Sequence, residues 1–214
     1  MSENVLKIST DLKMVIKMTR QKLSRFMLTT NFICSMFYSM SYPYIYAELM
    51  KAVNHFYISG EQILSCLGVV LFGILWNKKG DFLYKHYLKI VTLETIADTI
   101  LFAHVIITCN LKFYFVLNVL IYALITRNMA NGGIRLRAKV HPDEKSRERY
   151  DNNCNIVNST ATLVGSGIAL VTDMSLTVLF VAALVGNVFD NFCYYYIYYQ
   201  ANKLEENDRQ KGNI

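Results

Sequence analysis

A few ionisable residues lie inside long apolar stretches of the sequence, where charge is otherwise rare. They are Glu94, Asp98, Arg127 and Asp190. Ionisable side chains within apolar helices usually face a bundle interior or a water-filled cavity, and they often mark a substrate or ion pathway. Glu94 and Asp98 are four residues apart, so a helix would place both on one face. These residues are the candidate substrate- or ion-binding site.

The depth of these residues follows from helical rise. At ~1.5 Å per residue, Glu94, Arg127 and Asp190 reach a similar level in a ~30 Å hydrocarbon core, with Asp98 near the midplane. An Arg beside acids lowers the free-energy cost of burying each charge. Two interpretations stay open. One is a structural ion pair that locks the bundle, with Arg127 in reach of Glu94 or Asp190. The other is a coupling site, where protonation of an acid is linked to a conformational change.

The elements that must position these residues are six apolar segments. A spanning helix needs ~20 mainly apolar residues. The segments are 26–50, 58–76, 88–108, 113–130, 155–172 and 175–199. The fifth is the most polar, and its Ala161, Gly165 and Ala169 form a small-residue stripe that lets two helix backbones approach closely. The sequence therefore predicts an all-α membrane protein whose transmembrane domain covers 26–200.

The distribution of charge predicts the orientation. Of the residues, 53% are hydrophobic and 18% charged, and the formal net charge is +6. All of the 22 Lys and Arg residues except Lys51, Lys112 and Arg127 lie before the first segment, after the last, or in alternate connections and their edges, where Lys89 is the second residue of the third segment. Basic residues favour the cytoplasmic side, which predicts six spans with both termini cytoplasmic in the cell membrane. The basic groups would meet anionic lipid headgroups of the bilayer, and nucleic acid is not expected as a partner.

The two ends of the chain are polar. Apolar residues at helical spacing between Val5 and Arg25, with Lys and Arg on other faces, predict an amphipathic helix that lies in the headgroup layer, so 1–25 is an interfacial segment. Residues 201–214 form a polar cytoplasmic tail. The connections on the opposite side are short, and no extracellular domain is expected.

The remaining chemistry-bearing residues do not form a recognisable catalytic set. The five Cys residues contain no CxxC pair, and the four His residues are scattered, so neither a metal site nor a cofactor is expected. The segment Gly165-Ser166-Gly167 has no histidine placed near it by the predicted topology. An enzyme is therefore not expected.

One motif lies between the second and third segments. It reads Gly73-Ile-Leu-Trp-Asn77-Lys78-Lys79-Gly80. Together with the six-span topology, it resembles the signature loop of the amino-terminal half of a major facilitator superfamily transporter. Gly73, Lys78 and Gly80 match that signature, and Asn77 stands where the family has an acid. Arg127 followed by Gly132-Gly133 is similar to the family's fourth span.

The resemblance implies a function. It implies transport of a small molecule or ion by alternating access, with Gly73, Asn77, Lys78 and Gly80 in a conformational loop. The family usually has twelve spans around a path between two six-helix halves. This chain supplies one half, which implies a homodimer, a second six-helix half, a fragment or a non-transporting relative. Two alternatives remain: a multi-pass accessory or immunity protein that binds another membrane protein, and a six-helix substrate-capture subunit of an importer.

Overall fold

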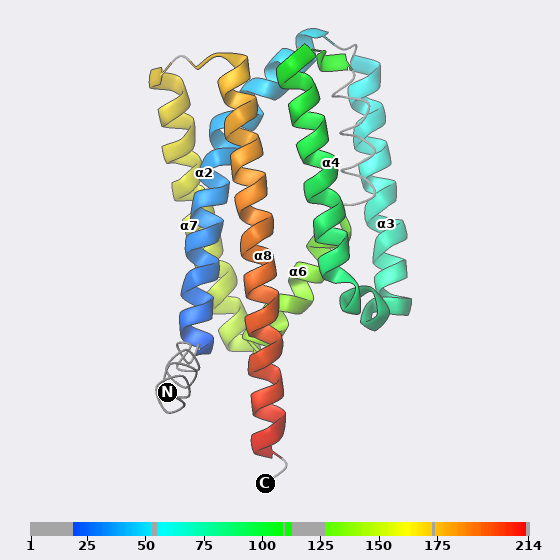
Figure 1. The fold of residues 1–214 in the computed structure, drawn as a ribbon, viewed down its shortest axis with the longest axis vertical. Helices are drawn as coiled ribbons and strands as arrows, with labels where there is room; N and C mark the ends of the chain where they lie inside the picture. Colours follow the sequence, from blue (N-terminus) through cyan, green and yellow to red (C-terminus); the bar gives the residue numbers. More distant parts are fainter. Residues whose placement is uncertain (1–18, 53–54, 109, 113–126, 173, 213–214) are drawn as a thin grey trace, which may run out of the picture.

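The computed structural model describes residues 19–52, 55–108, 110–112, 127–172 and 174–212. This part of the chain is all-α and holds six helices, labelled in Figure 1. They are α2 (Arg20–Ala52), α3 (His55–Lys85), α4 (Tyr87–Thr108), α6 (Arg127–Val140), α7 (Glu144–Thr172) and α8 (Leu176–Gly212). The predicted interfacial helix before residue 19 lies outside the described residues, as does most of the predicted span 113–130.

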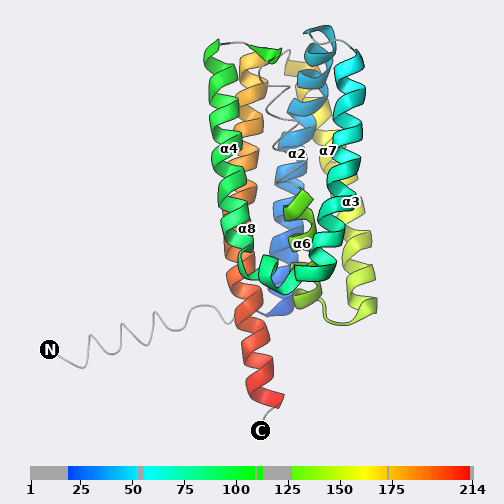
Figure 2. The same cartoon turned by 90° about the vertical axis from the view of Figure 1, so that its right-hand side faces the viewer.

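The helices run up and down between two ends of one bundle. At one end lie the start of α2, the turn between α3 and α4, the turn between α6 and α7, and the end of α8 (Figures 1 and 2). The described Lys and Arg residues of the predicted cytoplasmic segments lie there, so we call it the basic end and its opposite the far end. Helix α2 packs against both α7 and α8, while α4 packs on α8 and α3 contacts mainly α6.

Local sequence sets where several helices begin. Thr19 accepts a hydrogen bond from the Lys22 amide at the start of α2. Asp143 accepts one from the Ser146 amide at 2.7 Å and so caps α7, directly after Pro142 has ended the preceding helix. Such caps satisfy amides that have no partner within the helix. The two caps therefore fix the first turns of α2 and α7 at the basic end.

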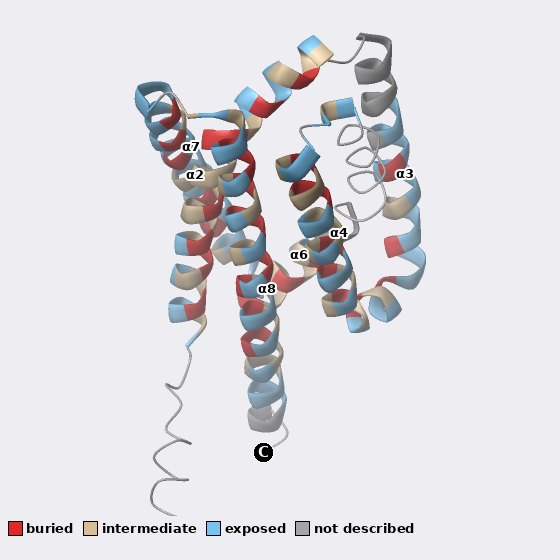
Figure 3. Cartoon of the chain, turned by 45° about the horizontal axis from the view of Figure 1, so that its top comes forward, coloured by how far each residue is buried: buried red, intermediate tan, exposed pale blue. Residues whose placement is uncertain are grey.

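Three of the described helices are long and apolar enough to cross a membrane, namely α4, α7 and α8. They are candidate membrane-spanning helices, as in a multi-pass membrane protein. Helix α2 contains the predicted span 26–50 but has many Ser, Thr and Asn side chains, which dilute its apolar character. The outer surfaces suit lipid contact, since Ile107, Leu170 and Val171 are 80%, 78% and 84% exposed (Figure 3).

The predicted small-residue stripe is confirmed as a helix-packing surface. Ala161, Gly165 and Ala169 are all buried on α7, where it packs against α2. A Cβ atom built on Gly165 would fall on the Met36 carbonyl oxygen of α2. The backbones of the two helices therefore approach each other most tightly where glycine removes the side chain.

A ladder of polar contacts runs beside this stripe. It joins α2 to α7 at three levels, each one helical turn from the next. The pairs are Asn31 with Cys154, Ser35 with Asn158, and Ser39 with Thr162, at 3.3, 3.0 and 3.1 Å. The residue numbers of the partners rise together on both helices, which means that α2 and α7 run parallel. The polar residues that dilute the fifth predicted span thus lie partly against another helix.

Two apolar clusters fill the bundle interior. The basic-end cluster is centred on buried residues of five helices, including Leu23, Tyr87, Leu136, Tyr150 and Ile197. The far-end cluster includes Ile45, Leu101, Phe102, Phe180 and Ala183. Along α4 and α8, the stretches between the two clusters include the polar residues Glu94, Asp98, Asn187 and Asp190. This interruption positions the site described next.

Candidate functional site

A layer of polar side chains crosses the bundle between the basic-end and far-end clusters. We call it the polar layer and define it by Tyr38, Glu94, Asp98, Asn187 and Asp190. Helix α4 supplies Glu94 and Asp98 between its apolar residues Val91 and Leu101. Helix α8 supplies Asn187 and Asp190 between Ala183 and Cys193, and α2 supplies Tyr38.

A chain of hydrogen bonds joins three helices in the polar layer. The Asn187 side-chain nitrogen donates to an Asp98 carboxylate oxygen. The Tyr38 hydroxyl donates to the Asn187 side-chain oxygen at 3.0 Å. The Asn187 amide therefore bridges a carboxylate on α4 and a phenol on α2, and any change in the protonation of Asp98 would be felt at both neighbours.

Asp190 lies one turn of α8 nearer to the basic end. Its carboxylate lies beside the Cys34 thiol of α2. A cavity of about 280 Å³ extends from Arg137 of α6 to Asp190, with Thr30, Asn31 and Tyr194 among its lining residues. Arg137 forms an ion pair of 3.1 Å with Asp151, and within the described residues it forms none with Asp190. The cavity thus joins a carboxylate in the polar layer to the charged surface of the basic end.

Two polar side chains at this level are deeply buried. Glu94 is 6% exposed and Asn191 is 2% exposed. The Asn191 side-chain nitrogen has no hydrogen-bond partner in the part of the chain that the structure describes. A buried amide donor without a partner carries a desolvation penalty. The polar layer therefore offers acids and amides to a proton, a cation or a small polar ligand.

The structure brings most of the predicted site residues together. Glu94 is buried, and Asp98 and Asp190 are half-buried, between the same two clusters. Arg127 is the first residue of α6, but its side chain lies outside the described residues. An ion pair between Arg127 and Glu94 or Asp190 therefore stays a prediction.

The predicted conformational loop takes a different form. Residues 77–85 continue α3 as a helix, which kinks at Lys79 (φ −132°, ψ 28°) and ends at Lys85. No proline interrupts this stretch, and glycine at position 80 alone does not end a helix. A Cβ atom on Gly80 would strike the Arg135 guanidinium of α6, whereas one on Gly73 would meet nothing within 4 Å. The predicted loop is thus a helical corner, and of its two glycines only Gly80 packs closely against another helix, at Arg135 of α6.

Two residues of the polar layer could not be assigned to it from the sequence. Tyr38 lies in an aromatic, apolar stretch and looks like a core or interfacial residue. Asn187 was visible as a polar residue in the sixth segment, but its role depends on Asp98, 89 positions away. Only the packing of α2, α4 and α8 reveals the connection.

Neither the family models, the curated proteins nor the solved structures with which the chain was compared match it. The polar layer, its cavity and the basic end are therefore the features that indicate a function.

Proposed function

We propose that the chain is a six-span protein of the cell membrane, with both termini cytoplasmic, that moves a small solute or ion through the polar layer. Five of the six predicted spans correspond, to within one residue, to parts of α2, α3, α4, α7 and α8, and of these α4, α7 and α8 are candidate membrane-spanning helices. The alternation of helix ends supports an even number of crossings, because the start of α2 and the end of α8 lie at the same end of the bundle (Figure 1). The concentration of Lys and Arg there supports a cytoplasmic basic end.

The observation that carries the transport proposal is the polar layer itself. Ionisable groups are expensive inside a membrane, and a bundle held together only by packing would need none. Three acids nevertheless lie between the two apolar clusters, and a cavity links one of them, Asp190, to the basic end. Carboxylates at that depth suit a proton or cation that is bound, carried and released as the bundle changes shape.

A second copy or another six-helix half would complete the path. Transporters of the facilitator type place the substrate near the midplane between two halves. The described helices leave broad apolar surfaces on α3, α4 and α7, which either lipid or a second half can cover (Figure 3). A homodimer is the simplest assembly that gives this chain two halves.

The alternative is a protein that does not transport, such as an accessory or immunity factor that binds another membrane protein. The hydrogen-bond chain from Tyr38 through Asn187 to Asp98 favours this alternative, because the same contacts can lock three helices together. In that case the acids would be structural, and their removal would change stability rather than flux.

Uptake by the reconstituted chain separates the two proposals. We would load vesicles containing the protein with a pH-sensitive dye, impose a solute gradient from a panel of small cations and polar metabolites, and measure coupled proton movement. Asp98→Asn should abolish the movement while leaving assembly intact. Glu48→Gln is the matched control, because Glu48 lies at the far end and pairs only with Lys51 in the described part of the chain. Unchanged flux in Asp98→Asn, or no flux with any solute and a co-purifying partner, supports the non-transporting alternative.

A further inference from the structure

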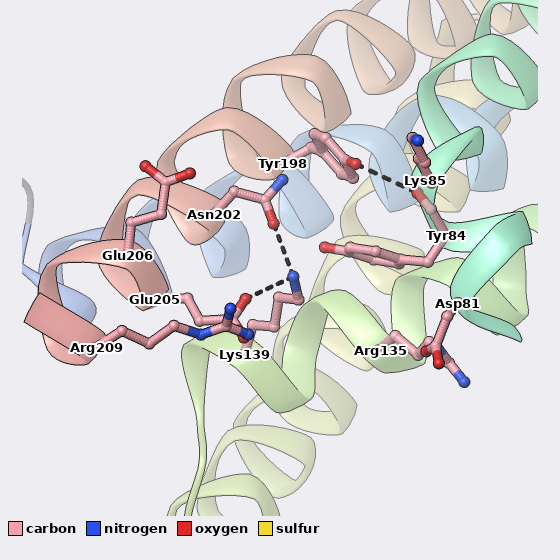
Figure 4. A pocket seen from close by; sticks show the side chains of 10 residues that line it. All are labelled: Asp81, Tyr84, Lys85, Arg135, Lys139, Tyr198, Asn202, Glu205, Glu206 and Arg209. Atoms are coloured by element: carbon pink, nitrogen blue, oxygen red, sulfur yellow. Dashed lines mark hydrogen bonds and ion pairs between the residues drawn. The ribbon is translucent and has the colours of Figure 1, made fainter. Parts of the chain in front are cut away.

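A second, larger cavity lies at the basic end, away from the polar layer. Its volume is about 500 Å³, and it lies between the end of α3, α6 and the last third of α8 (Figure 4). We call it the basic-end pocket. The residues that matter for its chemistry are Tyr84, Lys85, Arg135, Lys139, Glu205 and Arg209. Nothing in the transport proposal uses them.

The charges in the basic-end pocket are unevenly paired. Arg135 binds Asp81 at 2.6 Å. Glu205 is shared by two cations, Lys139 and Arg209, each at 2.7 Å. The Lys139 hydrogen bond is the main reason that the pKa of Glu205 is lowered. Lys139 also donates to the Asn202 side-chain oxygen at 2.8 Å, which leaves one donor of its ammonium for a ligand. Because the Glu205 carboxylate is the shared partner of Lys139 and Arg209, these three side chains together carry a net positive charge at the pocket.

Tyr84 contributes an unused hydrogen-bond donor. The side chain is 8% exposed, and its hydroxyl has no hydrogen-bond partner within the residues that the structure describes. Figure 4 shows that hydroxyl directed into the pocket, toward Lys139. The Lys139 ammonium lies 4.4 Å from the centre of the Tyr84 ring, so the donor and the cation can address one ligand. A buried hydroxyl without a partner lowers stability unless a ligand or water accepts a hydrogen bond from it.

The rim adds a further cation. Lys85 is exposed and lines the pocket where α3 ends. The acid Glu206 also lines it, but Figure 4 shows its carboxylate turned away from Tyr84 and Lys139. The inner wall of the basic-end pocket thus presents a neutral donor and ammonium or guanidinium groups, and its acids are either paired or directed outward.

We propose that the basic-end pocket binds a phosphate oxyanion, held by the Tyr84 hydroxyl and the Lys139 ammonium and attracted by the positive charge of Lys85 at the rim. A tetrahedral oxyanion has several acceptor oxygens, so it can accept from the phenol and from the Lys139 ammonium at once. The Lys85 ammonium points away from both in Figure 4 and contributes charge rather than a direct contact. The pocket lies where α3 and α8 pass from apolar to charged sequence, the level of lipid headgroups in a membrane. The phosphate can therefore belong to an anionic lipid headgroup or to a small soluble phosphate compound.

The test uses the full chain purified in a neutral detergent, with two probes. Inorganic phosphate is titrated against chloride at equal ionic strength by calorimetry. Retention of phosphatidic acid is measured by native mass spectrometry after incorporation into phosphatidylcholine vesicles with and without that lipid. Tyr84→Phe and Lys85→Gln are the test variants, and Tyr44→Phe and Lys51→Gln are matched controls at the far end. Loss of a charge-assisted hydrogen bond should weaken binding about tenfold in Tyr84→Phe.

The outcomes distinguish the two sources of the phosphate, a lipid headgroup and a soluble compound. Binding of both probes, weakened in the test variants and not in the controls, supports a site for the shared phosphate chemistry. Binding of phosphatidic acid alone supports a lipid headgroup, and binding of inorganic phosphate alone supports a soluble compound. No binding of either probe overturns the proposal, as does equal weakening in test and control variants. Because Lys85 is exposed, Lys85→Gln keeps the test valid if Tyr84→Phe does not fold.

Discussion

Replacing Gly165 with alanine tests the tight contact between α2 and α7 directly. The added Cβ atom would fall on the Met36 carbonyl oxygen and lie 3.1 Å from the Ser39 Cβ atom. The backbone carbonyl cannot rotate away without disturbing α2. Gly167 lies two residues further along the same helix, and a Cβ atom there would meet nothing within 4 Å. Gly167→Ala is therefore a control with the same chemistry and no clash.

The expected change in the free energy of unfolding follows from two opposing effects. Alanine in place of glycine stabilises a helix interior by roughly 0.5–1 kcal/mol, and this gain applies to both variants. Inserting a methyl group into a tightly packed contact costs about 1–3 kcal/mol, and this loss applies only at position 165. Gly167→Ala should thus be neutral or slightly more stable than the wild type. Gly165→Ala should be less stable than Gly167→Ala by about 1–3 kcal/mol.

The assay is reversible unfolding in mixed micelles, followed by the loss of helical circular dichroism as denaturing detergent is added. All three proteins are measured in the same lipid and neutral-detergent mixture, so that the difference between the two variants isolates the clash. If Gly165→Ala proves as stable as Gly167→Ala, α2 and α7 do not meet at this glycine, and the packing described for the small-residue stripe is wrong.

Three further predictions concern the contacts that hold the bundle. Ser39→Ala removes one rung of the polar ladder and should lower the unfolding free energy by only about 0.6 kcal/mol, measured in the same micelles. Arg20 ion-pairs with Asp208, so Arg20→Ala should speed hydrogen exchange at the end of α8 while the middle of α8 is unchanged. The pKa of Glu205 is lowered by Lys139, so its contribution to stability is present above the unfolded pKa of about 4.3 and lost as pH falls through the lower folded value. Glu205→Gln should flatten that acid-side dependence in a pH series of unfolding curves, and an unaltered slope would contradict the pairing.

Much of the helix arrangement could be predicted from local sequence. The acids at 94, 98 and 190 stand out because they interrupt apolar stretches, and the structure places them between two apolar clusters. The stripe through Gly165 was visible because small residues recur every four positions. Each signal lies in the local sequence of one helix, which is why a sequence alone can carry it.

The remaining features depend on distant pairings. Tyr38 joins the polar layer only because α2 packs against α8 at Asn187. The Tyr84 hydroxyl faces a pocket that exists because α6 and the end of α8 meet beside it. Lys139 and Glu205 were counted as charges of cytoplasmic segments, and nothing in their local sequence indicates that they pair. The helical corner at Lys79 was predicted as a loop because its charges and glycine resemble a connection, whereas two helical stretches of α3 meet there across a kink.

The central claim is that the polar layer becomes accessible in turn from each side of the membrane. Cys34 is 4% exposed and lies beside Asp190, so it reports on that level without a new residue at the site. In a variant whose four other cysteines are replaced by serine, a membrane-impermeant thiol reagent should label Cys34 slowly from either face of oriented vesicles. The same variant with Cys34→Ser should stay unlabelled. Labelling from one face only, or from neither, would contradict transport by alternating access.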